Sequence, residues 1–248
     1  MIYIKTEREI EKMREASKIV IDAHEYAKNL VVPGISTGEI DQKVDEFIRQ
    51  RGGIPATKGY GGFPGALCLS VNEEVVHGIP GKRIIQEGDI VSVDIVVKYG
   101  DYYSDAARTV AAGNISPTAE RLIEVTRQSF FEGIKYAKEG FRLFDISHAI
   151  QTYVEAQGFS IVRDYVGHGI GKSMHEDPQI PNFGPANRGP RLKKGMVLAI
   201  EPMVNEGVFQ VRTLEDNWTV VTSDGKLSAH YENTIVITDD EPEILTML

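Results

Sequence analysis

The fold is decided by the stretch Ile90–Thr109, which reads IVSVDIVVKYGDYYSDAART. Residues 90–97 are apolar and rich in β-branched side chains, as in a buried strand. Residues 98–101, Lys-Tyr-Gly-Asp, are a turn signal, and residues 102–107 resume as a second strand. The sequence therefore predicts an antiparallel β-hairpin.

Each strand of this hairpin carries one acidic residue. With the loop centred on Tyr99 and Gly100, we expect Asp94 directly opposite Asp105. Directly opposed residues have Cβ atoms roughly 4.5–5.5 Å apart, and like charges at that distance repel. Two facing carboxylates in an otherwise apolar hairpin require a counter-charge, and a divalent metal ion is the simplest one.

Helices are indicated before the hairpin by their capping residues. Thr6–Glu9 and Ser36–Glu39 each have the capping-box pattern, in which Glu follows a hydroxyl residue by three positions. Apolar residues then recur at three- and four-residue steps. The two helices are expected to end at Val32–Gly34 and at Gly52–Gly53.

A second pair of helices is expected after the hairpin. Ser116-Pro117 begins one that runs to about Lys138, and Asp145 caps a shorter one that ends at Gly158. Further strands are expected at residues 196–204, 218–222 and 230–238.

The second helix pair repeats the first, and the repeat continues into the strands. Matching residues stand 106 or 107 positions apart: Gly34 and Gly140, Ile40 and Ile146, Phe47 and Tyr153, Gly52 and Gly158, Gly88 and Gly195, and Asp94 and Glu201. Six agreements at nearly one offset indicate two related halves, about 6–110 and 116–248, around a pseudo-two-fold axis. No segment has the composition of a linker, so residues 1–248 are predicted to form a single domain.

Composition limits the class of protein. The chain has 248 residues, 42% of them hydrophobic and 25% charged, as in ordinary globular proteins. Its net charge of -9 argues against a nucleic-acid partner. The single cysteine, Cys68, excludes an intrachain disulfide, and no run approaches the roughly 18 apolar residues of a membrane span. We therefore expect a cytoplasmic protein without a membrane partner.

Four acidic residues lie inside apolar strand patterns, where a charge is costly unless it is paired or coordinated. Taken alone, each of them is better explained as a carboxylate that faces solvent or pairs with an Arg than as a metal ligand. Four together with a histidine form a hard, oxygen-rich set, which suits Mn, Fe or Co in a two-metal site. The candidate ligands are Asp94, Asp105, His168, Glu201 and Glu232.

The other histidines have less distinctive contexts. His77, like His168, precedes a glycine, where backbone or ligand can approach closely, and His175 lies in a loop. For each, a loop histidine that bonds to backbone is the alternative. His24 and His148 are expected to be structural, and His230 either structural or a support for Glu232.

Cys68 has no base or second thiol near it in sequence, so it is expected in a pocket or core. Residues 59–65, Gly-Tyr-Gly-Gly-Phe-Pro-Gly, lack the Lys-Ser/Thr ending of a phosphate loop. Their aromatic side chains line an apolar pocket or simply pack the loop.

These residues resemble those of the type I methionine aminopeptidases, from about residue 2 to the C-terminus. The matching motifs are SVNEEVVHGIP, VSVDIVV…GDYYSDAART, VGHGIG, MHEDPQIP, GMVLAIEPM and AHYENTIVIT. The resemblance implies the duplicated α+β "pita-bread" fold, with a central antiparallel sheet flanked by helices. It also implies removal of the initiator methionine when the second residue is small.

The resemblance further implies a dinuclear site, filled by two divalent ions such as Co, Mn, Fe(II) or Zn. Asp94 and Asp105 would be ligands on the hairpin, His168 and Glu201 would share one metal, and Glu232 would bridge both. A hydroxide between the metals would attack the first peptide carbonyl, with Glu201 passing protons.

By the same resemblance, His175 would hydrogen-bond the carbonyl oxygen, and His77 would contact the scissile amide. Tyr60, Phe63, Cys68 and Trp218 would form the methionine pocket. Two departures from the family pattern are Met174, where an aromatic residue or Leu is expected, and Asn233, where His is common. They bear on pocket shape and metal preference.

Two alternatives stay open. An Xaa-Pro aminopeptidase or prolidase shares the fold but usually carries a large N-terminal domain, whereas the repeat here begins at about residue 6. A non-catalytic metal- or peptide-binding protein is expected to have lost metal ligands or auxiliary histidines. Here the five candidate ligands and the two histidines, His77 and His175, are all present. Expected partners are peptides and nascent chains with N-terminal Met. The family suggests a monomer, and a ribosome contact would fit cotranslational trimming.

Overall fold

The computed structural model describes residues 1–247. Within them the α-helices are α1 (Glu7–Leu30), α2 (Thr37–Gln50), α3 (Pro117–Ile134) and α4 (Leu143–Ala156), and a 3-10 helix, η1, spans Tyr60–Gly62. The predicted starts of the first three helices are confirmed: the backbone N–H groups of Thr6 and Ser36 donate to the carboxylates of Glu9 and Glu39, and Ser116 caps α3.

The later helices end sooner than expected. α3 stops at Ile134 rather than at about Lys138, and Lys138 instead forms a parallel β-bridge with Thr238. α4 stops at Ala156, before Gly158 turns into the left-handed region with φ of 83°. Asp145 is not the N-cap residue of α4: it lies in the first turn and accepts from the backbone N–H of Arg142, 2.8 Å away.

A large antiparallel sheet forms the centre of the molecule. Its strands are β1 (Ile54–Pro55), β2 (Cys68–Val71), β4 (Ile90–Tyr99), β5 (Tyr102–Ala111), β7 (Gly167–Gly169), β8 (Glu176–Ile180), β9 (Val197–Ile200), β14 (Glu232–Val236) and β15 (Glu243–Ile244). The order is β1-β4-β5-β14-β9-β7-β8, with β2 also on β4 and β15 also on β14.

Two smaller sheets complete the strand content of the described residues. One contains β13 (Ser228–His230), β10 (Met203–Asn205) and β6 (Ser160–Ile161), and the other contains β11 (Val211–Thr213), β12 (Val220–Thr222) and β3 (Glu74–Val76).

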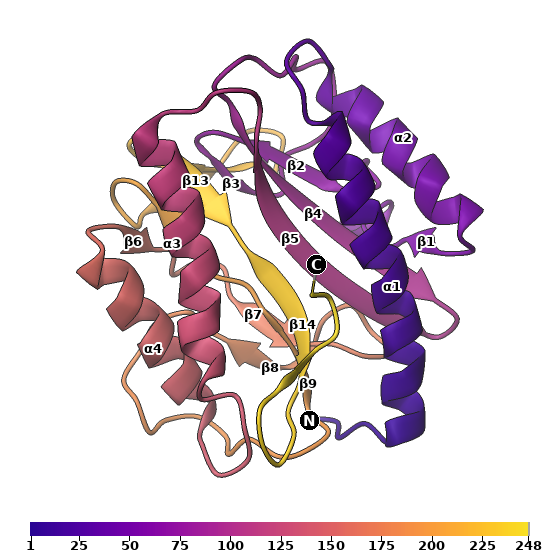
Figure 1. Cartoon of the computed structure of the whole chain (residues 1–248), viewed down its shortest axis with the longest axis vertical. Helices are drawn as coiled ribbons and strands as arrows, with labels where there is room; N and C mark the ends of the chain where they lie inside the picture. The colour runs from indigo at the N-terminus through magenta and orange to yellow at the C-terminus, as the bar shows by residue number, and fades with distance from the viewer. Residues whose placement is uncertain (248) are drawn as a thin grey trace.

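The two halves of the chain meet in the middle of the large sheet, where β5 pairs with β14. Figure 1 shows α1 and α2 at one side of the molecule and α3 and α4 at the other. Buried residues of α1 and α2 pack with β2 and β4, and those of α3 and α4 pack with β9 and β14. The predicted arrangement of an antiparallel sheet with flanking helices is confirmed.

The β4–β5 hairpin has a different register from the one expected. Its loop is Gly100-Asp101, and Tyr99 pairs with Tyr102. Gly100 has φ of 58°, and left-handed backbone of this kind suits the two-residue turns that match the twist of the flanking strands. The turn therefore lies one residue later than the sequence suggested.

As a result, Asp94 pairs with Ala107, and Asp105 pairs with Val96. The expectation that Asp94 directly faces Asp105 is wrong by two residues. Because a shift of two preserves the alternation of side chains, both carboxylates still lie on the same face of the hairpin, as diagonal neighbours.

Two of the long strand runs expected in the second half are each divided between two sheets. Residues 196–204 give β9 and β10, separated by Glu201-Pro202, and residues 230–238 give the end of β13 and then β14, separated by Tyr231. Proline lacks the N–H that a continuous ladder needs. The breaks place Glu201 and Glu232 where the chain passes from one sheet to the other.

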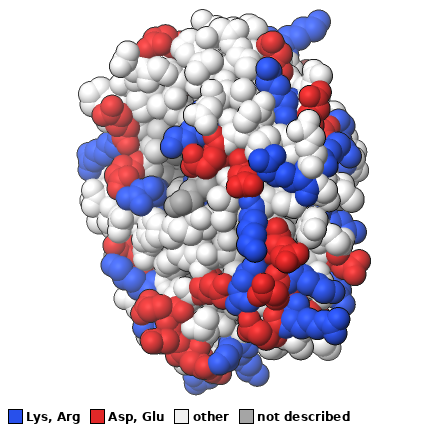
Figure 2. All heavy atoms as spheres, turned by 45° about the vertical axis from the view of Figure 1, so that its right-hand side comes forward, with Lys and Arg blue, Asp and Glu red and all other residues white. Residues whose placement is uncertain are grey.

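The surface is mixed in charge. Figure 2 shows basic and acidic side chains interspersed over the face that carries α1 and α2. Residues 1–247 include no helix with both the length and the apolar character needed to cross a bilayer.

Candidate metal centre and active site

One cavity of about 170 Å³ brings the candidate site residues of the sequence together. Its lining includes the five candidate ligands Asp94, Asp105, His168, Glu201 and Glu232, the histidines His77 and His175, and the four pocket candidates Tyr60, Phe63, Cys68 and Trp218. It also includes Thr57, Val96 and Met174, of which only Met174 was singled out from the sequence. The side chains come from both halves of the chain.

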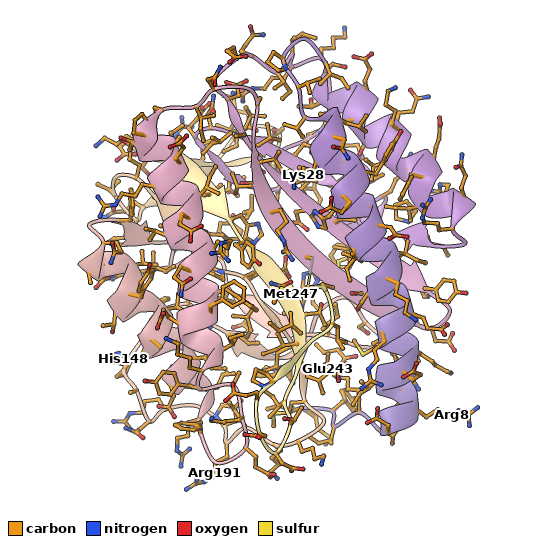
Figure 3. All side chains as sticks on the ribbon, in the orientation of Figure 1. Arg8, Lys28, His148, Arg191, Glu243 and Met247 are labelled. Atoms are coloured by element: carbon orange, nitrogen blue, oxygen red, sulfur yellow. The ribbon has the colours of Figure 1, made fainter. Side chains whose placement is uncertain are left out.

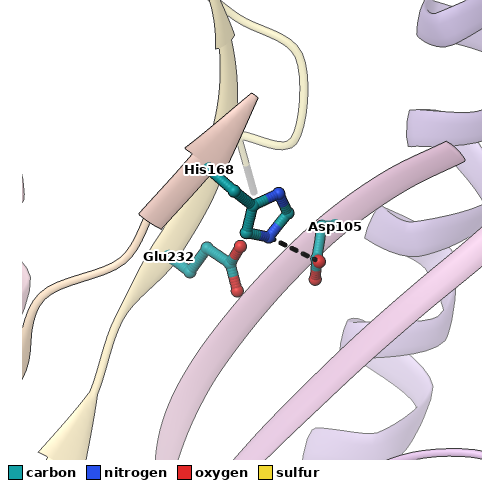
Figure 4. Close-up of side chains that lie close together, drawn as sticks. All are labelled: Asp105, His168 and Glu232. Carbon is teal, nitrogen blue, oxygen red and sulfur yellow. Dashed lines mark ion pairs between the residues drawn. The ribbon is translucent and has the colours of Figure 1, made fainter. Parts of the chain in front are cut away.

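Three of the candidate ligands form a compact buried group. Asp105, His168 and Glu232 each offer a ligand atom, and these atoms lie within 4.8 Å of one another. Figure 4 shows the three side chains converging from β5, β7 and β14. Strand pairing fixes this meeting point, because Glu232 pairs with Ala107 on β5 and His168 pairs with Ala199 on β9.

The imidazole of His168 is oriented for coordination. Its Nδ1 lies 2.9 Å from the carbonyl oxygen of Gly169, and because a carbonyl only accepts, Nδ1 carries the hydrogen. Nε2 is then free, 3.7 Å from Asp105 Oδ2 and 3.6 Å from Glu201 Oε1. Burial, followed by the nearby His175, lowers the pKa of His168 to about 4, so the ring is neutral at pH 7.

The carboxylates repel one another in the absence of a cation. Burial raises the pKa of Asp94 to about 7, and a hydrogen bond with the Asp105 carboxyl acts in the opposite direction. Burial, and then the charge of Asp94, raises the pKa of Asp105 well above its usual range. Burial, and then the charge of Asp105, does the same for Glu201 and Glu232.

The donor set fits divalent metal ions. Asp105 Oδ1 and Glu232 Oε1 are buried and have no hydrogen-bond partner among the described residues. Buried polar atoms are normally satisfied, and unpaired oxygen ligands beside a neutral imidazole nitrogen are what a hard or borderline divalent cation binds. The acidic repulsion and the unpaired oxygens therefore require a positive charge at this position.

His230 also faces the acidic group. Its Nε2 lies 3.7 Å from Glu201 Oε2 and 4.0 Å from Glu232 Oε2 and has no hydrogen-bond partner within residues 1–247. The two helical histidines lie elsewhere: His24 is buried against the Ala106 carbonyl oxygen, at 2.9 Å, and Figure 3 shows His148 beside α4 at the edge of the molecule.

His77 lines the cavity and packs against aromatic rings. Its ring meets Tyr165 and Trp218 edge to face, with centroids 5.5 and 6.2 Å apart. Its φ of 59° is a strained backbone conformation for a residue other than glycine. A Cβ on Gly78 would lie 2.3 Å from the Leu69 carbonyl oxygen. The glycine is therefore needed for the close approach of the Leu69 backbone and not for the approach of a ligand.

His175 is held from both sides. Its Nδ1 lies 2.7 Å from the Tyr60 hydroxyl, and its ring centroid is 4.4 Å from that of His168. Burial lowers the pKa of His175, so the ring is neutral at pH 7. Hydrogen bonding at Nδ1 leaves Nε2 as the atom available to a ligand.

The apolar part of the cavity is aromatic. Phe63 and Trp218 meet edge to face at 5.2 Å, and Phe63 is almost fully buried. Cys68 pairs with Asp94 across β2 and β4, and its burial raises the pKa of the thiol well above the usual value. The thiol is therefore a poor nucleophile and contributes as a lining group.

Sequence reasoning missed Arg108, which lies behind the acidic group. Its guanidinium donates to the carbonyl oxygens of Ala107, Glu232 and Thr246 and to Asn233 Oδ1. Asn233 accepts at 2.6 Å, and Arg108 is 9% exposed. The sequence offered only one signal, namely Asn233 at a position where His is common.

The comparisons with known proteins cover the whole chain. The profile of metallopeptidase family M24 matches residues 11–239. Methionine aminopeptidase 1 of Bacillus subtilis is 58% identical over 99% of both chains. The crystal structure of methionine aminopeptidase from Thermotoga maritima matches with a TM-score of 0.98, 50% identity and complete coverage of both chains, which confirms the pita-bread fold.

The alternative within the same fold is more distant. The prolidase of Pyrococcus horikoshii matches with a TM-score of 0.80 and 22% identity, and the match covers 98% of this chain but 63% of the prolidase. That likeness shows the shared fold alone.

Proposed function

The chain belongs to metallopeptidase family M24, and we propose that it is a methionine aminopeptidase that removes Met from peptides whose second residue is small. The observation that carries this proposal is its similarity, over nearly the whole chain, to bacterial methionine aminopeptidases. The cavity lined by acids, histidines and aromatic side chains supports it.

We assign the metal site to Asp94, Asp105, His168, Glu201 and Glu232, and we propose that they hold two divalent ions, which are Mn, Co, Fe(II) or Zn. Membership of a metallopeptidase family implies divalent metal, and the orphaned carboxylate oxygens fit it. Bound ions supply Lewis acidity and make water a nucleophile at neutral pH.

Glu201 is the proposed proton carrier. It lies at the end of β9 and lines the cavity, and burial raises its pKa so that its carboxylate can take up a proton. A carboxylate so placed accepts the proton of the attacking water and returns it to the departing amine nitrogen.

The two cavity histidines are proposed to bind the peptide at the reacting bond. If the Tyr60 hydroxyl donates to Nδ1 of His175, Nε2 of that ring carries a hydrogen. This N–H can donate to the carbonyl oxygen as it gains charge. His77, held against Tyr165 and Trp218, is then the contact for the scissile amide.

The methionine side chain is proposed to bind among Tyr60, Phe63, Cys68 and Trp218, with Met174 beside them. A flexible thioether packs well against aromatic rings. We further propose that the protein works as a monomer in the cytoplasm on nascent chains, where a ribosome contact would bring the cavity to its substrate.

The test compares matched peptides on the purified, metal-loaded protein. With Mn, Co or Fe(II), we expect release of Met from Met-Ala-Ser, poor turnover of a peptide with a bulky second residue, and loss of activity in EDTA. Readdition of metal should restore the activity.

Other outcomes would reassign the function. Preferential cleavage of Ala-Pro peptides would place the enzyme with the prolidases. Stoichiometric metal binding without turnover of any peptide would favour a binding protein on this scaffold.

A further inference from the structure

A buried ion pair joins the start of the chain to the middle of its second half. Lys5 Nζ lies 2.7 Å from Glu176 Oε2, and the two side chains are 6% and 8% exposed. In every other Lys or Arg pair with a carboxylate within residues 1–247, at least one partner is more than a quarter exposed. Apolar side chains of similar volume often stabilise a fold as well as a buried ion pair does. Stability alone therefore does not explain why this pair is buried.

Glu176 closes the loop that carries His175. Its Oε1 accepts from the backbone N–H groups of Lys172, at 2.8 Å, and Ser173, at 3.2 Å. The same carboxylate thus organises the loop with one oxygen and binds Lys5 with the other. A Cβ on Gly171 would lie 2.6 Å from Lys5 Cε and 2.7 Å from Glu176 Oε1, so no slack remains between them.

Lys5 is itself anchored to the rest of the site. Its backbone N–H donates to the carbonyl oxygen of Gly195, 2.8 Å away, just before the strand that leads to Glu201. The loop is fixed at its other end, where Tyr103 N–H donates to the Gly171 carbonyl oxygen at 2.9 Å, two residues before Asp105. Lys5 therefore links the turn before β9 to the His175 loop, and the bond from Tyr103 links that loop to β5.

His175 depends on such an anchor. Residues 171–175 form neither helix nor strand, so no helix or strand ladder fixes the backbone that carries this ring. The orientation of the ring rests on the bond to Tyr60, on the contact with the His168 ring and on the path of the loop.

We propose that Lys5 is a positioning residue: through Glu176 it holds the loop so that the His175 ring stays between Tyr60 and the metal centre. The role of His175 in turnover rests on the proposed function. The position of the ring does not, so the two ideas can be tested separately.

The test replaces the ion pair by neutral side chains of similar size. Lys5→Met with Glu176→Gln removes both charges and keeps a carbonyl oxygen for the amides of Lys172 and Ser173. The matched control is Lys135→Met with Glu132→Gln, a pair at the C-terminal end of α3 whose side chains are 61% and 27% exposed. Both proteins are loaded with Mn for the measurement of metal affinity, kcat and KM. The ¹⁵N shifts of labelled His175 are recorded on the Zn-loaded proteins, because Zn is diamagnetic and does not broaden the signals.

We expect the Lys5/Glu176 variant to keep its metal affinity within twofold and its KM for Met-Ala-Ser within threefold. Its kcat should fall about 10- to 100-fold, as for a displaced catalytic group. The ¹⁵N shifts of His175 should move toward those of a free, tautomerically averaged ring. The control should match the wild type in all four measurements.

Wild-type kcat together with unchanged His175 shifts would overturn the proposal. If this variant does not fold, Lys5→Gln with Glu176→Gln replaces the ion pair by a neutral hydrogen bond, and the same criteria apply. If the wild type itself releases no Met, the proposed function fails, whereas the His175 shifts still decide whether Lys5 positions the ring.

Discussion

Asp94 and Asp105 are diagonal neighbours on one face of the β4–β5 hairpin, since Asp94 pairs with Ala107 and Asp105 with Val96. Diagonal residues in an antiparallel pair are about 7–8 Å apart, against roughly 4.5–5.5 Å for directly opposed ones. The diagonal placement keeps both carboxylates in the cavity lining, where they still interact with each other. It also lets Asp105 reach His168 and Glu232, with which it forms the compact group.

The substitution Asp105→Asn is expected to have opposite effects with and without metal. It removes a proposed ligand, so metal affinity should fall by more than about 10- to 100-fold, the loss typical when a residue that hydrogen-bonds to a metal ligand is replaced. It also removes repulsion with Asp94, so the melting temperature of the metal-free protein should rise. Calorimetry with Mn, and thermal unfolding in EDTA, measure the two effects.

Glu243→Gln is the control, because that carboxylate pairs with Arg14 outside the cavity. Unchanged metal affinity in Asp105→Asn would exclude this residue as a ligand.

The buried acidic group should make the metal-free protein less stable as the pH rises above about 4, the ordinary pKa of carboxyl groups. From pH 7 upward the histidines no longer oppose this trend. Burial raises the pKa values of Asp105, Glu201 and Glu232 well above the usual range, so the folded protein holds protons that the unfolded chain has released. Linkage then destabilises the fold with increasing pH. The buried histidines act in the opposite direction, but only at lower pH. The pKa of His168, for example, is about 4 in the folded protein against an ordinary value of 6.5, so its effect on stability lies between these two values.

Thermal unfolding between pH 7 and 8.5 tests this prediction. The melting temperature should decline in EDTA and stay nearly constant with saturating Mn, because bound metal replaces the protons. Parallel curves in the two buffers would contradict it.

The substitution His77→Ala should lower kcat by about 10²- to 10⁴-fold, the usual range for a group that moves or stabilises a proton. Because alanine is itself strained at the positive φ of position 77, the melting temperature of this variant is measured beside its turnover. His77→Asn is the backbone control, because Asn adopts positive φ readily. Wild-type turnover in either variant would remove His77 from the mechanism.

The substitution Arg108→Gln should weaken both the fold and the metal site. Losing the guanidinium leaves several buried carbonyl oxygens unpaired, at about 1–3 kcal/mol for each group left unsatisfied. Because Arg108 holds the backbone of Glu232, metal affinity should fall about 10- to 100-fold. Denaturant unfolding and calorimetry separate the two losses, and an unchanged affinity would show that Arg108 acts on stability alone.

Much of the fold could be predicted from the sequence because its signals are local. The capping boxes at Thr6 and Ser36 define two helix starts with four residues each. The apolar runs around Asp94 and Glu201 identify strands, and their common offset predicts a duplication. The chemical types of the candidate ligands follow from the cost of burying charge, which holds wherever the strands lie.

Other features were decided by contacts between distant segments. The hairpin register follows from the turn at Gly100-Asp101, and the breaks at Glu201-Pro202 and Tyr231 follow from strands that change sheets. The guanidinium of Arg108 reaches four acceptors, three of them more than 120 residues away or in the C-terminal segment. No local pattern encodes such partners.

The sequence by itself thus determined which acidic and histidine side chains are candidates for binding metal and which segments fold as helices and strands. Those choices depend on near neighbours and on the cost of buried charge. Only the tertiary structure decided the diagonal placement of Asp94 and Asp105, the hydrogen bond between Tyr60 and His175, and the ion pair between Lys5 and Glu176. Those relationships depend on strand register and on the packing of the two halves, which are properties of the whole chain.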